Sequence, residues 1–314
     1  MPVHSHLPNL LTALNDDILF QIMNNLTLAD LVALRSLCSH SDDIVATFLT
    51  SRLRTLLARF FDNVDAARTL MRNTNSVISG SSALAYVLPS NINWQPHDLD
   101  LYVPNGEFTH VVNSLVLSEH YTNVSPAHII DHYTGPVERV VRLQKDNRNV
   151  DVIQSASDTA LHPIAFFWLT AVTNYVSADH AYVGYPELTF AQRALLHPHY
   201  INNFHTIAPR ANSLIEKYQQ RDFDIRMREI SWSHYSPRPG QIIRERKGSC
   251  ASIIRFFGDD FGLTTPIHTS DTVIPDITAR QRLTVLWRRG GIPCGLGCVG
   301  RPRDVNTFAE EVGI

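Results

Sequence analysis

The stretches SGSS at residues 79–82 and DLDLYV at residues 98–103 decide the fold of this chain. The first is a turn of small residues that opens a predicted helix over 83–88, and the second is a predicted strand. Residues i and i+2 of a strand point to the same face, so Asp98 and Asp100 share one face while the apolar residues face a core. Two ionised carboxylates about 6–7 Å apart repel each other unless a cation lies between them. Mg²⁺, which binds a few carboxylates together with waters and substrate phosphates, fits this arrangement.

A third carboxylate interrupts an apolar strand further along the chain. Residues 140–144 and 150–153 are typical of two strands, and the polar residues 145–149 are typical of the turn between them. This predicted hairpin carries Asp151 between two valines. A single charge within an apolar strand faces either solvent or a functional cleft.

The small residues before the predicted helix have two interpretations. A helix N-terminus offers free N–H groups and partial positive charge, which suit a phosphate, and Gly80 allows the backbone to approach closely. Alternatively, Ser81 or Ser82 is an ordinary helix N-cap. The carboxylates downstream favour the phosphate interpretation.

Together these pieces resemble the signature of the nucleotidyltransferase fold, the superfamily of polymerase β and the poly(A) and CCA-adding enzymes. The resemblance covers roughly residues 76–155, with one departure: sixteen residues separate Ser81 from Asp98, so a loop is inserted over 89–96. It implies three catalytic carboxylates that bind Mg²⁺ or Mn²⁺: Asp98, Asp100 and Asp151. It also implies three residues that hold the triphosphate of a nucleoside triphosphate: Gly80, Ser81 and Ser82. Asp151 would in addition activate the acceptor hydroxyl.

The N-terminal residues carry a second pattern. Asn15 is a predicted N-cap of a helix in which Ile18, Ile22 and Leu26 recur every four residues, and Thr27 caps a second helix. Residues 14–38 resemble an F-box, the helical module that docks an adaptor onto the Skp component of a cullin–RING ubiquitin ligase. Two departures are Asn15 in place of the usual proline and the absence of an aromatic residue after the cysteine. The alternative is a helical hairpin that packs on the catalytic domain.

Bulk properties favour an intracellular protein. With 314 residues and a net charge of −3, the chain is long enough for about two domains and shows no general attraction for nucleic acid or membrane. No apolar run approaches the roughly 20 residues that span a bilayer, and four cysteines do not suggest a disulfide framework. We expect a cytoplasmic or nuclear location and no membrane partner.

The remaining chain gives weaker patterns. Apolar periodicity favours helices over 45–61, 106–117, 161–175, 188–196 and 208–230, a strand over 181–184, and turns from 231 onward. Three basic residues of the predicted hairpin are placed where they could reach a triphosphate: Arg142, Lys145 and Arg148. The basic residues from Arg221 to Lys247 alternate with acids, which is typical of a solvated face.

These observations predict an α/β (α+β) protein with a nucleotidyltransferase-type mixed sheet and helices. An F-box-like helical module (1–60) would precede the core (61–235), and a helical or irregular region (236–314) would follow it. The predicted function is Mg²⁺-dependent transfer of a nucleoside monophosphate to a hydroxyl of an unknown RNA, protein or small molecule. The alternatives are a non-catalytic F-box adaptor that uses the fold for recognition, and a nucleotide sensor that binds without turnover.

Overall fold

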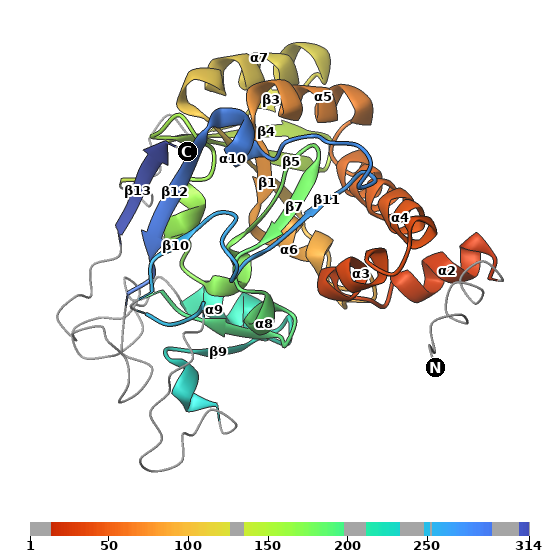
Figure 1. Ribbon diagram of the computed structural model, residues 1–314. Coiled ribbons are helices and arrows are strands. Elements are labelled where there is room, and N and C mark those ends of the chain that lie inside the picture. Colours follow the sequence, from red (N-terminus) through yellow and green to blue (C-terminus); the bar gives the residue numbers. More distant parts are fainter. Residues whose placement is uncertain are drawn as a thin grey trace, which may run out of the picture.

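A computed structural model describes residues 14–125, 135–197, 212–232, 248–251, 253–290 and 308–313. Its centre is an eight-stranded mixed sheet with helices packed around it (Figure 1), so the predicted α/β class is confirmed. Helices α2 to α4 lie on one side of the molecule, and strands β10, β12 and β13 lie on the opposite side (Figure 1). None of the helices in these residues is long and apolar enough to cross a membrane.

The strand order of the large sheet is β11-β7-β6-β1-β2-β5-β4-β3. Neighbouring strands are antiparallel, except for β2 and β5, which are parallel. The strands are β1 (Val77–Ser79), β2 (Asp98–Val103), β3 (Thr122–Asn123), β4 (Val137–Lys145), β5 (Arg148–Ser155), β6 (Asn174–Val176), β7 (His180–Val183) and β11 (Leu263–Pro266). A three-stranded sheet contains β10 (Arg255–Phe256), β12 (Leu283–Arg288) and β13 (Phe308–Gly313). A two-stranded sheet contains β8 (Arg193–Leu195) and β9 (Asp224–Arg226).

Alternation along the central strands separates the core from the polar face. Leu99, Leu101 and Val103 of β2 are buried, as are Val150 and Val152 of β5, and all five belong to one large apolar core. This core continues into the helices α2 (Asp16–Met23), α3 (Leu28–Arg35), α4 (Ser39–Ala58), α5 (Val64–Thr74), α6 (Gly80–Val87), α7 (Phe108–Ser118) and α9 (Asn212–Gln219). The short helices α8 (Pro186–Thr189) and α10 (Ile277–Gln281) pack in two smaller apolar clusters.

The capping residues of the N-terminal helices act as predicted. The Asn15 side chain accepts a hydrogen bond from the backbone N–H of Asp17 at the start of α2. Thr27 and Asp30 form a capping box at the start of α3, in which each side chain accepts from the other residue's backbone N–H. These local bonds fix both helix starts independently of tertiary packing.

Three predictions for the middle and end of the chain are wrong. Residues 161–175 form short 3-10 turns followed by the start of β6, and 188–196 contain the end of α8 and then β8. Helix α9 ends at Gln219, and the chain turns through Asp222 at φ 66° into β9. Most side chains over 160–196 are buried, and apolar periodicity cannot separate a helix from a strand in segments buried on every side.

The residues after 231 also contribute to the core of the fold. Strand β11 pairs with β7 at the end of the large sheet, and β12 pairs with β10 and β13. The expected succession of turns is therefore interrupted by strands. Residues 263–266 belong to the central sheet rather than to a covering segment.

A buried ion pair connects the N-terminal helices to strand β11 and the residues that follow it. Arg35 at the end of α3 donates from Nε to Oδ1 of Asp42 on α4 at 2.6 Å, and from Nη2 to the carbonyl oxygen of His268 at 2.6 Å. It also donates to the carbonyl oxygen of Pro266 in β11. Although burial opposes it, hydrogen bonds from Ser270 and Arg35 lower the pKa of the Asp42 carboxyl. The pair thus holds α3 and α4 against residues 265–270.

Replacing Arg35 by methionine should reduce the free energy of unfolding by about 3 kcal/mol or more, because Asp42 would remain buried without its cation. Urea unfolding followed by circular dichroism measures the loss. Arg54→Met is the matched control, since Arg54 lies on α4 in an exposed pair with Asp65 and should leave the midpoint almost unchanged. Equal midpoints for the two variants would show that the buried pair does not anchor the helices.

Candidate metal centre

One row of side chains crosses four strands of the large sheet. Ser79 on β1 is paired with Asp100 on β2, which is paired with Asp151 on β5, which is paired with Arg142 on β4. Paired residues on neighbouring strands lie on the same face of a sheet. Asp98 lies two positions before Asp100 and therefore on the same face.

The three predicted carboxylates come together on this face. Asp98, Asp100 and Asp151 each offer a carboxylate oxygen, and these oxygens lie within 4.8 Å of one another. Asp151 is buried, whereas Asp98 and Asp100 keep part of their surface exposed. Solvent can therefore reach the cluster, and the paired strands β2 and β5 hold the three side chains in place.

The position of Gly80 requires a glycine because its backbone lies very close to the Asp100 carboxylate. Its φ of +63° lies in the left-handed region, and a Cβ built on it would lie 2.1 Å from Oδ2 of Asp100. Any side chain at this position would collide with the carboxylate. The backbone at the start of α6 therefore lies directly against the acidic cluster.

The serines around Gly80 do not act as ordinary helix caps. Ser79 is the N-cap residue of α6, but its hydroxyl donates to the carbonyl oxygen of Asn174 and makes no capping bond. The Ser82 hydroxyl donates to the carbonyl oxygen of Asp98 at 2.8 Å, which ties α6 to β2. Ser81 is buried beside them. The interpretation of Ser81 or Ser82 as the N-cap is wrong, and α6 begins without a side-chain cap.

Of the three basic residues proposed on the hairpin, only Arg142 contacts the cluster. Its Nε donates to Oδ1 of Asp151 at 2.7 Å and its Nη2 donates to Oδ2, and these hydrogen bonds raise the pKa of the Arg142 guanidinium. Lys145 and Arg148 instead both pair with Asp62. Arg142 thus fixes the orientation of Asp151, which keeps two further lone pairs for other ligands.

The middle carboxylate is strongly perturbed. Burial, together with the charges of Asp98 and Asp151, raises the pKa of Asp100 to about 7, while Lys217 and Arg142 act in the opposite direction. A raised pKa is what like-charge repulsion predicts, although desolvation is the larger cause. In the metal-free protein, one of the three carboxyls is therefore protonated in part at neutral pH.

Helix α9 brings cations that the sequence pattern did not assign to this site. Lys217 is exposed and its charge acts on Asp100, although 117 positions separate the two residues along the chain. Arg221, just after α9, is buried with its guanidinium 4.0 Å from the centre of the Trp94 ring, and the charge of Asp98 acts on it. Arg221 was predicted to belong to a solvated face, and that prediction is wrong. Only tertiary contact places these residues here.

The donor set fits a hard divalent cation. All three candidate ligands are carboxylates, two of them partly open to solvent, and oxygen ligands of this kind suit Mg²⁺ or Mn²⁺. The raised pKa of Asp100, caused first by burial and then by the charges of Asp98 and Asp151, means that a bound divalent cation would favour the ionised cluster.

The pH dependence of stability should reveal the raised pKa. Folded Asp100 keeps its proton up to about pH 7, whereas an unfolded aspartate releases it near pH 4. Its contribution to stability is therefore complete below about pH 4 and is lost as the pH rises through 7, with a slope of at most about 1.4 kcal/mol per pH unit. Urea unfolding in EDTA between pH 5 and pH 8 measures this slope.

Asp100→Asn should remove this component, and Asp65→Asn, at an exposed position, should keep it. Other titrating groups, such as the buried His180, are present in all three proteins and cancel in the comparison. The same slope in wild type and Asp100→Asn would contradict the assignment.

The chain was also compared with protein-family models, with curated proteins and with solved structures, and none of the three comparisons found a match. The geometry of the acidic cluster and of α6 therefore carries the functional argument alone.

Proposed function

We propose that the chain transfers a nucleoside monophosphate from a nucleoside triphosphate to a hydroxyl acceptor, with Mg²⁺ or Mn²⁺ as the cofactor. The observation that carries this proposal is the convergence of three carboxylates within 4.8 Å, directly beside the N-terminus of α6. A carboxylate cluster offers sites for cations, and a helix N-terminus offers N–H groups for phosphate. Phosphoryl chemistry uses both.

Each residue of the site has a part in this reaction. Gly80, Ser81 and Ser82 present the N-terminal backbone of α6 to the triphosphate, and Lys217 supplies a cation whose charge acts on Asp100. Asp98, Asp100 and Asp151 would hold the divalent cations. A bound cation supplies positive charge that balances the carboxylates and the leaving pyrophosphate and lowers the pKa of the acceptor hydroxyl.

The bonds exchanged are those of an in-line displacement. Asp151, oriented by Arg142, accepts a hydrogen bond from the acceptor hydroxyl and directs its oxygen toward the α-phosphorus. The new oxygen–phosphorus bond forms as the bond from the α-phosphorus to the bridging oxygen breaks. Pyrophosphate leaves, and a carboxylate of the cluster accepts the hydroxyl proton.

Incubation with each of the four nucleoside triphosphates, labelled at the α-phosphate, tests the proposal. With Mg²⁺ or Mn²⁺ present, we expect pyrophosphate release and transfer of label to RNA, to protein or to a small acceptor. Asp98→Asn should reduce the rate on the order of 100-fold or more, because it removes charge where the cation and the phosphates meet. Asp65→Asn, which changes an exposed aspartate on α5, should leave the rate unchanged.

Binding is measured separately from turnover. Mg²⁺ and nucleotide should each raise the melting temperature of the wild type, and Asp98→Asn should lose the metal response. Binding without turnover would favour a nucleotide sensor. The absence of any metal-dependent or nucleotide-dependent shift would contradict both the enzyme and the sensor.

The second candidate function is that of an F-box-type adaptor, and the exposed apolar residues of the N-terminal helices favour it. Ile18 and Ile22 lie four apart on one face of α2 and are each 47% exposed, and Leu37 beyond α3 is 53% exposed. Large apolar side chains exposed side by side on a helix are typical of a docking surface. In contrast, Leu31 is fully buried and contributes to the fold.

Co-purification with a Skp-type adaptor tests this second function. The double variant Ile18→Asp, Ile22→Asp should abolish the complex and leave the melting temperature nearly unchanged, because both side chains face outward. Leu117→Asp on α7 is the matched control, since Leu117 is 74% exposed on a different helix and should keep the complex. Failure of the wild type to bind the adaptor would exclude this function and leave the transferase proposal unaffected.

A further inference from the structure

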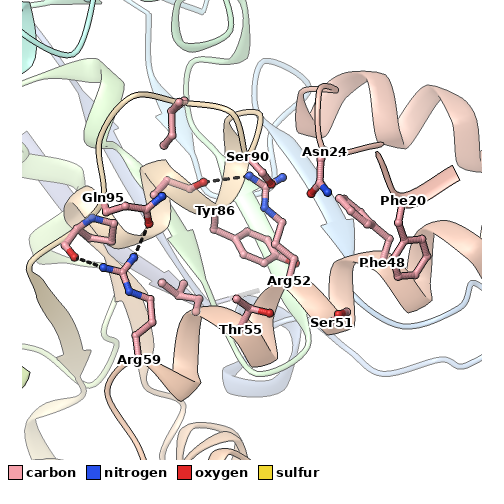
Figure 2. A pocket seen from close by; sticks show the side chains of 14 residues that line it. Phe20, Asn24, Phe48, Ser51, Arg52, Thr55, Arg59, Tyr86, Ser90 and Gln95 are labelled. Carbon is pink, nitrogen blue, oxygen red and sulfur yellow. Dashed lines mark hydrogen bonds between the residues drawn. The ribbon is translucent and has the colours of Figure 1, made fainter. Parts of the chain in front are cut away.

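A cavity separate from the acidic cluster lies between α2, α4, α6 and the loop that joins α6 to β2 (Figure 2). Its volume of about 350 Å³ falls in the range of small-molecule sites. Arg52 of α4 and Arg59, the C-cap residue of that helix, line it together with the polar side chains of Asn24, Ser51, Thr55, Ser90 and Gln95. None of the lining residues that the structure describes is acidic.

Arg52 and Arg59 lie on the same side of the C-terminal part of α4. They are seven residues apart, which is about two helical turns or roughly 10 Å, and both point toward the loop that carries Ser90 and Gln95 (Figure 2). No salt bridge joins either guanidinium to a carboxylate within the described residues. Both cations therefore contribute uncompensated positive charge to one cavity.

Arg52 has hydrogen-bonding capacity that the fold does not use. Its Nη2 donates to the carbonyl oxygens of Ala85 at 3.0 Å and of Leu88, which closes the C-terminal end of α6. Its Nη1 is buried and has no acceptor among the described residues. Burial lowers the pKa of Arg52 to about 10, as expected for a desolvated cation that no acid balances. A buried donor without an acceptor is rare in native structures and calls for a ligand.

Arg59 also lines the cavity. It donates from Nη2 to the carbonyl oxygen of Pro96 at 2.8 Å and from Nη1 to Oε1 of Gln95. These neutral acceptors hold the guanidinium against the loop and leave its charge in place. A negatively charged group between the two arginines would balance both.

Aromatic side chains form the apolar part of the wall. Phe20 of α2 and Phe48 of α4 meet edge to face, with ring centroids 5.5 Å apart, and Tyr86 of α6 lies beside Arg52. Leu56 and Ile92 complete this part. A ligand with a flat apolar body and a charged head would match both kinds of wall.

We infer that this cavity binds a small organic oxyanion, a carboxylate or phosphate monoester carried on an aromatic body, with its head at Arg52 and Arg59. Arginine binds the two oxygens of such groups in a fork, and the edge of the cavity offers hydroxyl and amide donors. Because Nη1 of Arg52 is closed to solvent, a small outward shift of the loop over 90–96 accompanies binding. That loop leads into β2, so the occupied cavity would hold the segment just before Asp98.

Titration calorimetry with phenyl phosphate and with benzoate tests this inference. The buffer contains EDTA, so that no divalent cation at the acidic cluster attracts the probe, and its ionic strength is kept constant in all titrations. We expect one of the two probes to bind at one site per chain. Inorganic phosphate should bind with an affinity at least about tenfold lower, because it lacks the aromatic body. The stronger probe identifies the head group.

Three variants localise the binding. Arg52→Gln should weaken the better probe about tenfold or more, because a charge-assisted hydrogen bond is lost. Thr55→Phe fills the cavity but keeps both arginines, so it should abolish binding; this variant tests the inference even if Arg52→Gln fails to fold. Arg54→Gln, on the same helix but paired with Asp65 outside the cavity, should bind like the wild type. Equal binding in all variants, or no binding of either aromatic probe by the wild type, would overturn the inference.

Discussion

Electrostatic repulsion between neighbouring carboxylates is the constraint on which the rest of the structure depends. Asp100 and Asp151 lie opposite each other on paired strands, with Asp98 on the same face, and like charges in such positions destabilise a sheet. Two features of the fold reduce this repulsion. Arg142 balances the outer carboxylate from the next strand, and the middle carboxylate keeps its proton to about pH 7. Neither response removes the repulsion completely, which leaves the cluster ready for a cation.

The same constraint explains local choices in the chain. Asp100 can point toward α6 only because Gly80 has no side chain, and Ser82 holds that turn against the backbone of β2. The register of β2 and β5 is equally restricted. A shift of one residue would turn Asp151 into the core and a valine toward the other carboxylates, so the pairing that builds the cluster also protects the core.

The sequence predicted these central elements well because their signals are local. The alternation in DLDLYV, the apolar strand around Asp151 and the capping residues Asn15 and Thr27 each need only a few neighbouring residues. The segments from 161 to 196 are buried on nearly every side, so their periodicity carried no information about helix or strand. Lys217 and Arg221 reach the site from far along the chain, and no local pattern indicates such a contact. The burial of Arg52 could not be predicted for the same reason.

The position of β11 has a consequence for how the protein is made. Strand β7 ends at Val183, but its outer partner comes only with residues 263–266. During synthesis at roughly 5–20 residues per second, the ribosome needs several seconds to supply the intervening residues. Throughout that interval β7, whose own side chains are apolar or aromatic after His180, presents an open edge that can pair with another nascent chain. Chaperone demand should thus be greatest late in translation, after the strands that carry the acidic cluster have been synthesised.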